Sequence, residues 1–137
     1  MRVEEIRYKE KVLAIIVKKG TKTDAARFFT PEDYPLQLGI NTYKEGVKVK
    51  PHVHKAFLRQ INTSLEVLHI EQGEAEVYFY NNEGRKVETR TLKKGDTIVL
   101  IGGHGLKFLR DTKIIEVKQG PYVGVEKEKK FLECEGV

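Results

Sequence analysis

The sequence has few of the features that place proteins outside a reducing compartment or in a membrane. Cys134 is the one cysteine among 137 residues, so the chain cannot form an internal disulfide. No apolar run approaches the roughly 20 residues of a membrane-spanning helix, and the longest candidate, residues 12–17, is typical of a strand. Residues 1–5 already include acidic side chains and lack the apolar core of a signal peptide. We therefore expect a cytoplasmic protein without a membrane segment.

The usual motifs for a nucleophile or for nucleic-acid binding are also missing. No serine lies in a Gly-x-Ser-x-Gly turn, and Cys134 has no histidine near it in sequence. The formal charge is +5, but lysine and arginine alternate with glutamate through most of the chain instead of forming one basic block. We therefore read the charge as a solvated surface and expect no nucleic-acid partner. The length suits a single domain with one core.

From about residue 36 the sequence consists of short β-branched and aromatic runs separated by turn residues. This spacing is typical of all-β barrels and sandwiches. The clearest hairpin joins residues 75–80 to 86–90 through Asn81-Asn82-Glu83-Gly84, whose residue types tolerate left-handed backbone. The predicted strands are 37–43, 47–54, 65–71, 74–80, 86–92, 97–101, 106–109 and 113–118.

The regions on either side of this block are predicted to be appendages. Residues 1–35 are expected to form an N-terminal extension with one strand, at 12–18, and one helical turn at 23–29. That strand suits either the core or a subunit contact. Residues 36–120 would form the β-domain, and residues 121–137 a C-terminal tail that either closes a short helix or stays mobile.

Histidine is the residue type that indicates chemistry. The chain has four histidines, and two of them form His52-Val53-His54. Residues i and i+2 of a strand point to the same face, so both imidazoles can approach one metal ion. Glu66, at the start of a predicted strand, and His104, after another, are further ligands of the right chemical type. His69 falls on the face opposite Glu66, where a surface or packing role is expected.

These residues lie in two motifs. The first runs from Gly46 through His52 and His54 and continues with Glu66, which Gly73 follows after six residues. The second begins at Gly95-Asp96, passes through an apolar run and ends at Gly102-Gly103-His104. Both resemble the paired motifs of the cupin superfamily. They depart from it in the eleven-residue spacer 55–65, where the family usually has three or four residues, and in the lack of a proline before His104.

The resemblance implies a small single-domain cupin, which is an antiparallel jelly-roll β-barrel. It implies one divalent metal ion, iron, manganese, nickel or zinc, bound by His52, His54, Glu66 and His104, with open positions for water or substrate. Cupins with this arrangement include isomerases, epimerases and dioxygenases, some acting on sugar derivatives, so the fold does not name a reaction. Cupins also commonly form homodimers, and we expect a homodimer here.

Several alternatives stay open at the level of sequence. The domain is either a metalloenzyme acting on a small organic molecule or a binding module for a small molecule or carbohydrate that performs no chemistry. Glu66 is either a metal ligand or a buried acid paired with Arg59. Arg59, in the long spacer, either contacts a ligand at the mouth of the barrel or is solvated like most loop arginines.

Overall fold

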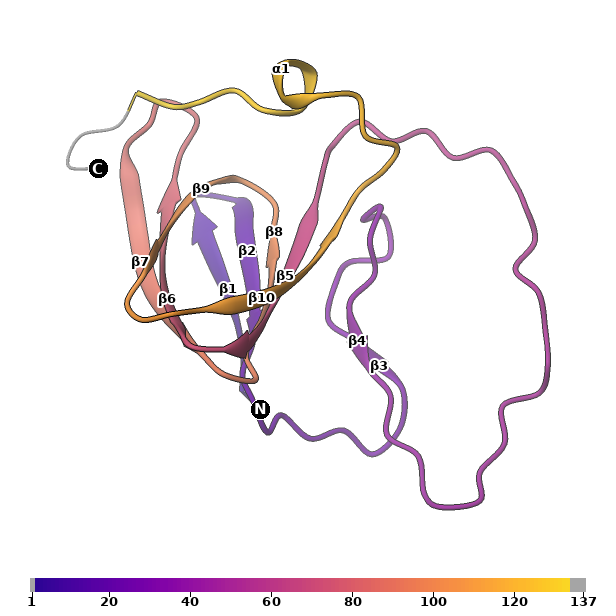
Figure 1. Ribbon diagram of the computed structural model, residues 1–137. Coiled ribbons are helices and arrows are strands. Elements are labelled where there is room, and N and C mark those ends of the chain that lie inside the picture. Colours follow the sequence, from indigo (N-terminus) through magenta and orange to yellow (C-terminus); the bar gives the residue numbers. More distant parts are fainter. Residues whose placement is uncertain (1, 134–137) are drawn as a thin grey trace.

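The protein is built almost entirely of antiparallel strands. The computed structural model describes residues 2–133, and Cys134 therefore lies outside the described residues. A single short helix, α1 (Val125–Glu128), follows the strands (Figure 1). The all-β class predicted from the sequence is confirmed. The strands are β1 (Val3–Tyr8), β2 (Lys11–Val17), β3 (Arg27–Phe28), β4 (Gly39–Ile40), β5 (Glu66–Gln72), β6 (Glu74–Tyr80), β7 (Lys86–Lys93), β8 (Thr97–Leu100), β9 (Gly103–Phe108) and β10 (Lys113–Lys118).

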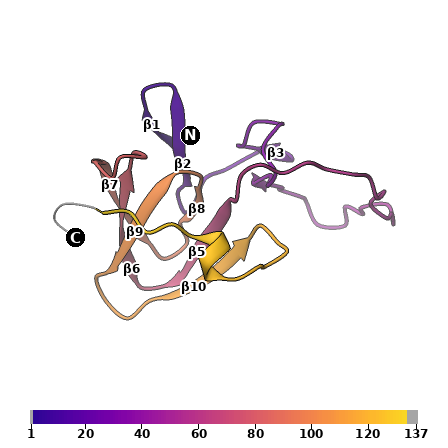
Figure 2. The same ribbon diagram turned by 90° about the horizontal axis from the view of Figure 1, so that it is seen from above.

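Two sheets carry the core. A five-stranded sheet has the order β1-β2-β8-β5-β10, and a three-stranded sheet has the order β7-β6-β9. The chain crosses from one sheet to the other between β5 and β6, and Figures 1 and 2 show the two sheets curling around a common interior. The short β3 and β4 pair with each other outside these sheets. Among the described strands, hydrogen bonding therefore gives three separate sheets and no closed ring.

The alternation of side chains along β2 and β8 explains the packing of the interior. Ala14 and Ile16 of β2 point into the cluster between the two sheets, where they meet Val77 and Phe79 of β6, and all four are fully buried. Ile15 points the opposite way, into a second cluster on the outer face of the five-stranded sheet. A strand that is buried on both faces needs a continuous apolar run, and residues 12–17 provide one. The strand of the N-terminal extension thus occupies a core position.

Two turns fix the ends of the strands that surround the site. Gly73, between β5 and β6, has φ +97°, and a side chain there would meet the carbonyl oxygen of Asp111. Asp96, in the turn before β8, is 4% exposed. Its carboxylate accepts hydrogen bonds from the backbone N–H groups of Lys19 and Lys93, each at 2.8 Å. The Gly-Asp pair of the second motif therefore has a structural role, which ties this turn to the end of β2.

Most of the predicted strands are confirmed, with bounds that shift by a few residues, but three predictions in the first half of the chain are wrong. No strand forms over 47–54, and the strand predicted at 37–43 is reduced to β4. The helical turn predicted at 23–29 is replaced by bends and β3. Residues 41–65 instead form one long segment without regular structure, which Figure 1 shows running away from the sheets. β1, at the edge of the main sheet, was not expected.

Candidate functional site

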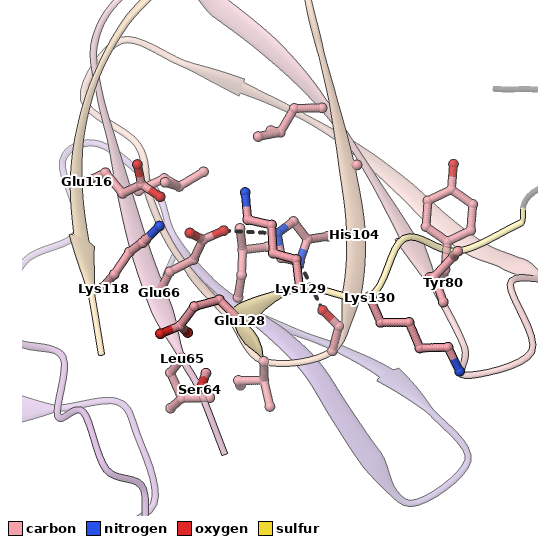
Figure 3. Close-up of a pocket in the computed structure, with 18 of the residues that line it drawn as sticks. Ser64, Leu65, Glu66, Tyr80, His104, Glu116, Lys118, Glu128, Lys129 and Lys130 are labelled. Carbon is pink, nitrogen blue, oxygen red and sulfur yellow. Dashed lines mark hydrogen bonds and ion pairs between the residues drawn. The ribbon is translucent and has the colours of Figure 1, made fainter. Parts of the chain in front are cut away.

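A cavity of about 740 Å³ opens at one end of the space between the two sheets. Its floor is apolar and includes Leu68, Leu100 and Leu106 from three different strands. Its rim is polar and is formed by the start of β5, the start of β9, the end of β10 and the chain after α1 (Figure 3). A concave site with an apolar floor and a few converging polar groups is the usual form of a small-molecule site.

Glu66 and His104 meet at this rim. Nε2 of His104 lies 2.9 Å from Oε1 of Glu66, and the two residues are 38 positions apart in sequence. Glu66 shares its face of β5 with the core residues Leu68 and Ile70. His104 is the cross-strand neighbour of the buried Phe79, so it also points inward. Two of the four predicted metal ligands are therefore brought into contact, at the mouth of the cavity.

The hydrogen bonds of His104 define its charge. Nδ1 lies 2.9 Å from the carbonyl oxygen of Gly102, and Nε2 faces the Glu66 carboxylate. Because a carbonyl oxygen and a carboxylate only accept hydrogen bonds, this arrangement favours the imidazolium form, in which both ring nitrogens donate. Burial lowers the pKa of His104, but the hydrogen bonds to Glu66 and to the Gly102 carbonyl outweigh it and raise the pKa above its usual 6.5.

Glu66 also interacts with a second acid, Glu116 of β10. The hydrogen bond from His104 lowers the pKa of Glu66 to about 2, against the effect of burial. The pKa of Glu116 is raised, first by its hydrogen bond with Glu66 and then by burial. At neutral pH, Glu66 is thus the ionised member of the pair and Glu116 is the one that holds a proton more readily. The rim combines a carboxylate, an imidazolium and an acid near one another.

The other two predicted ligands lie elsewhere, in the segment 41–65. The rings of His52 and His54 are 5.2 Å apart between centroids, and Nδ1 of His52 is 2.7 Å from the Lys50 carbonyl oxygen. Both side chains are exposed, and Figure 1 shows that their segment stands apart from the sheets. Arg59, the predicted ligand contact, stacks its guanidinium 3.7 Å from the centroid of the Phe57 ring within the same segment. It does not line the cavity, and no ion pair joins it to Glu66 among the described residues.

The set of three imidazoles and one carboxylate fits a divalent transition metal in chemical kind. In position it is divided into two pairs, Glu66 with His104 and His52 with His54. Within residues 2–133, no three His, Cys, Asp or Glu side chains are grouped so that they could hold an ion. Binding of one ion by all four residues therefore requires the segment 41–65 to approach the start of β9.

Several residues of the rim were missed by sequence reasoning. In β10 the alternation places Ile114, Glu116 and Lys118 toward the cavity, whereas Ile115 and Val117 point outward and are about half exposed. A prediction from polarity alone puts the charged face outside, so it gives the wrong orientation for this strand. The pairing of Lys118 with Glu66 could not be predicted from the sequence either. The two residues are cross-strand neighbours on β10 and β5, and these strands are far apart in sequence.

Comparison of the chain with family models, with characterised proteins and with solved structures finds no match. The resemblance to the cupins is a resemblance of the two sequence motifs, and none of these comparisons adds to it. Within the part of the chain that the structure describes, no helix has the length and apolar character needed to cross a membrane.

Proposed function

We propose that this protein is a small cupin-like domain that binds a small organic molecule in the cavity between its sheets, at a divalent metal site. The observation that carries the proposal is the contact between Glu66 and His104, because two residues from separate motifs, both predicted as ligands, meet at the mouth of a cavity. The jelly-roll topology, the metal and its identity as iron, manganese, nickel or zinc are parts of the same proposal.

In this proposal the metal would be held by Glu66 and His104 together with His52 and His54, and it would supply a Lewis acid to the bound molecule. The residues of the chain have further roles. Glu66 and His104 hold each other in a fixed orientation, and Glu116 stands beside them as a proton donor or acceptor. The apolar floor excludes water from one side of the ligand. An isomerase, epimerase or dioxygenase reaction on a sugar derivative would use these parts.

The second candidate function is a binding module without catalysis. The observation that favours it is the separation of the four predicted ligands into two pairs. The cavity is lined by Glu66 and His104, whereas His52 and His54 do not contribute to its walls. In that case the protein captures a small molecule or carbohydrate and the metal is dispensable.

Elemental analysis separates these functions. The native protein, and protein reconstituted in turn with Fe²⁺, Mn²⁺, Ni²⁺ and Zn²⁺, is compared with a His52→Ala, His54→Ala double variant and a Glu66→Gln variant. His69→Ala is the matched control, since His69 faces away from the cavity and bonds to Thr97 at 2.8 Å. We expect about one ion per chain, lost in the double variant and in Glu66→Gln and retained in the control.

Two other results would change the assignment. An ion retained in the double variant would remove His52 and His54 from the site. A folded native protein that holds no metal after reconstitution would leave only the binding module.

A further inference from the structure

The C-terminal segment that begins with α1 forms one wall of the cavity. We call residues 125–132 the strap, because Figure 1 shows this segment crossing over the open end of the two sheets. Glu128, Lys129, Lys130, Phe131 and Leu132 of the strap all line the cavity. The strap is held at both ends: Val123 donates its backbone N–H to the Glu128 carboxylate at 3.2 Å, and the Leu132 side chain packs onto Gly103 of β9. A ligand in the cavity would therefore contact the strap directly.

Three lysines reach this cavity, Lys118 from β10 and Lys129 and Lys130 from the strap. Among the described residues, none of them forms a hydrogen bond or an ion pair with a carboxylate. Nζ of Lys118 lies 5.5 Å from the centroid of the Tyr122 ring, and the Glu66 carboxylate is already bonded to His104. Figure 3 shows Lys118 and Lys129 beside the Glu66–His104 pair, and Lys130 directed away from it. Two ammonium groups without an acidic partner thus lie at the place where a ligand would sit.

Electrostatic interactions agree with this placement. The charge of Lys129 acts on both His104 and Glu116, and the charge of Lys118 acts on both Glu66 and Glu116. Glu128 of the strap lines the same cavity as Glu66 and Glu116, so three carboxylates lie there together with the lysines. The lysine ammonium groups, which no carboxylate of the described residues pairs at ion-pair distance, are the groups of this wall that would bind an anionic group on a ligand.

A polar atom beside the lysines also lacks a partner. Oε1 of Gln119, the residue after Lys118, is buried and accepts no hydrogen bond from any described residue, and Gln119 lines the same cavity. Its backbone N–H donates to the carbonyl oxygen of Leu65 at 3.0 Å, which fixes the residue against β5. Buried acceptors are nearly always hydrogen-bonded in native proteins. A hydroxyl group of a ligand is the natural donor to this oxygen.

We propose that the cavity recognises a small hydroxylated organic anion, whose carboxylate or phosphate group lies against Lys118 and Lys129 while a hydroxyl group donates to Oε1 of Gln119. The inference rests on the proposed function only in that the cavity binds a small molecule. It adds the class of ligand, and it assigns Lys129 of the strap to specificity. It does not depend on a metal or on the segment 41–65.

Isothermal titration calorimetry at constant ionic strength tests this inference on the protein as purified. Three probes share a polyhydroxylated chain: gluconate carries a carboxylate, glucose 6-phosphate carries a phosphate, and sorbitol is neutral. We expect at least one anion to bind about tenfold or more tightly than sorbitol, as a charge-assisted hydrogen bond would provide. The stronger of the two anions identifies the anionic group.

Matched variants assign the contacts. Lys129→Gln is expected to weaken the preferred anion about tenfold, whereas Lys127→Gln, two residues away on α1 and outside the cavity, is expected to leave it unchanged. Gln119→Leu should weaken the anions and sorbitol alike, because it removes the acceptor for a hydroxyl group. Urea unfolding of each variant verifies that the fold is retained.

The opposite results overturn the inference. It fails if sorbitol binds as tightly as both anions, if Lys129→Gln leaves anion binding unchanged, or if neither anion binds. These failures differ from a failure of the proposed function. Sorbitol binding that is independent of lysine, or one metal ion bound per chain, would leave the small-molecule site standing with another class of ligand.

Discussion

The contact between Glu66 and His104 makes a prediction about stability that needs no knowledge of the ligand. Replacement of Glu66 by Gln and of His104 by Gln, singly and together, gives a double-mutant cycle for the pair. A charged hydrogen bond contributes about 1.5–3 kcal/mol when it is shielded from water. Because the side chains of His104 and Glu66 are 29% and 19% exposed, respectively, solvent screening reduces our expected coupling energy to about 1–2 kcal/mol.

The pH dependence of this coupling follows from the two pKa shifts. Glu66 has a pKa lowered from 4.5 to about 2, so its contribution to stability is complete above pH 4.5 and is lost as the pH falls through 2. His104 has a pKa raised above 6.5, so its contribution is complete below pH 6.5 and is lost as the pH rises through the raised value. The coupling should therefore be largest between pH 4.5 and 6.5 and smaller at pH 9.

Urea unfolding of the four proteins at pH 5.5 and pH 9, with a chelator present, measures the coupling. The cycle is necessary because Glu66→Gln alone also relieves the interaction with Glu116, which offsets part of the loss. A parallel cycle of Glu66→Gln with His69→Gln is the control, because His69 lies on the same strand but on the other face, and its coupling should be below about 0.5 kcal/mol. A Glu66–His104 coupling no larger than the control at pH 5.5, or one that grows toward pH 9, would refute the charged-pair interpretation.

Two further predictions concern the turn before β8 and the free face of β10. Asp96→Ala should destabilise the protein by about 2–3 kcal/mol, since the backbone N–H groups of two part-buried hydrogen bonds lose their charged acceptor. Urea unfolding beside the exposed-site control Asp33→Ala measures the difference. A loss of less than about 1 kcal/mol would show that Asp96 is dispensable to this turn. The expected homodimer would use the outward face of β10, an edge strand on which Ile115 is 51% exposed. Ile115→Lys should therefore yield a monomer in sedimentation equilibrium, whereas Lys94→Glu, at an exposed position in the turn between β7 and β8, should not. A native protein that is monomeric at all concentrations would contradict this prediction.

The sequence predicted well those strands whose local signals agree with their tertiary surroundings. β6 alternates alanine, valine and phenylalanine with polar residues, and the apolar set is fully buried as the alternation requires. β1 was missed because its alternation is short, with Ile6 as its one buried residue. The orientation of β10 could not be predicted from polarity, because a cavity reverses the usual rule and gives the polar face of a strand the inner position.

The candidate site was predicted in part for a similar reason. Chemical type and spacing are properties of the sequence, and they identified Glu66 and His104 although the two residues are 38 positions apart. The groups that complete the rim, Glu116, Lys118 and Lys129, belong to no motif, and their role depends on a register and a crossing segment that only the fold specifies.

The segment 41–65 is where the motif and the described fold differ most, and its composition bears on how they are reconciled. Its valines alternate with lysine and histidine over 47–54, as in a half-buried strand, yet Val49 and Val53 are 59% and 88% exposed. At the same time β9, which carries His104, has a hydrogen-bonded neighbour on one side only among the described strands, and that neighbour is β6. A strand-like segment without a partner and a strand edge without a neighbour lie in one small domain, and pairing them would bring His52 and His54 toward Glu66 and His104. Loss of the metal in the His52, His54 double variant, with anion binding by Lys129 intact, is therefore the combination of results expected if this segment approaches Glu66 and His104 to complete a metal site.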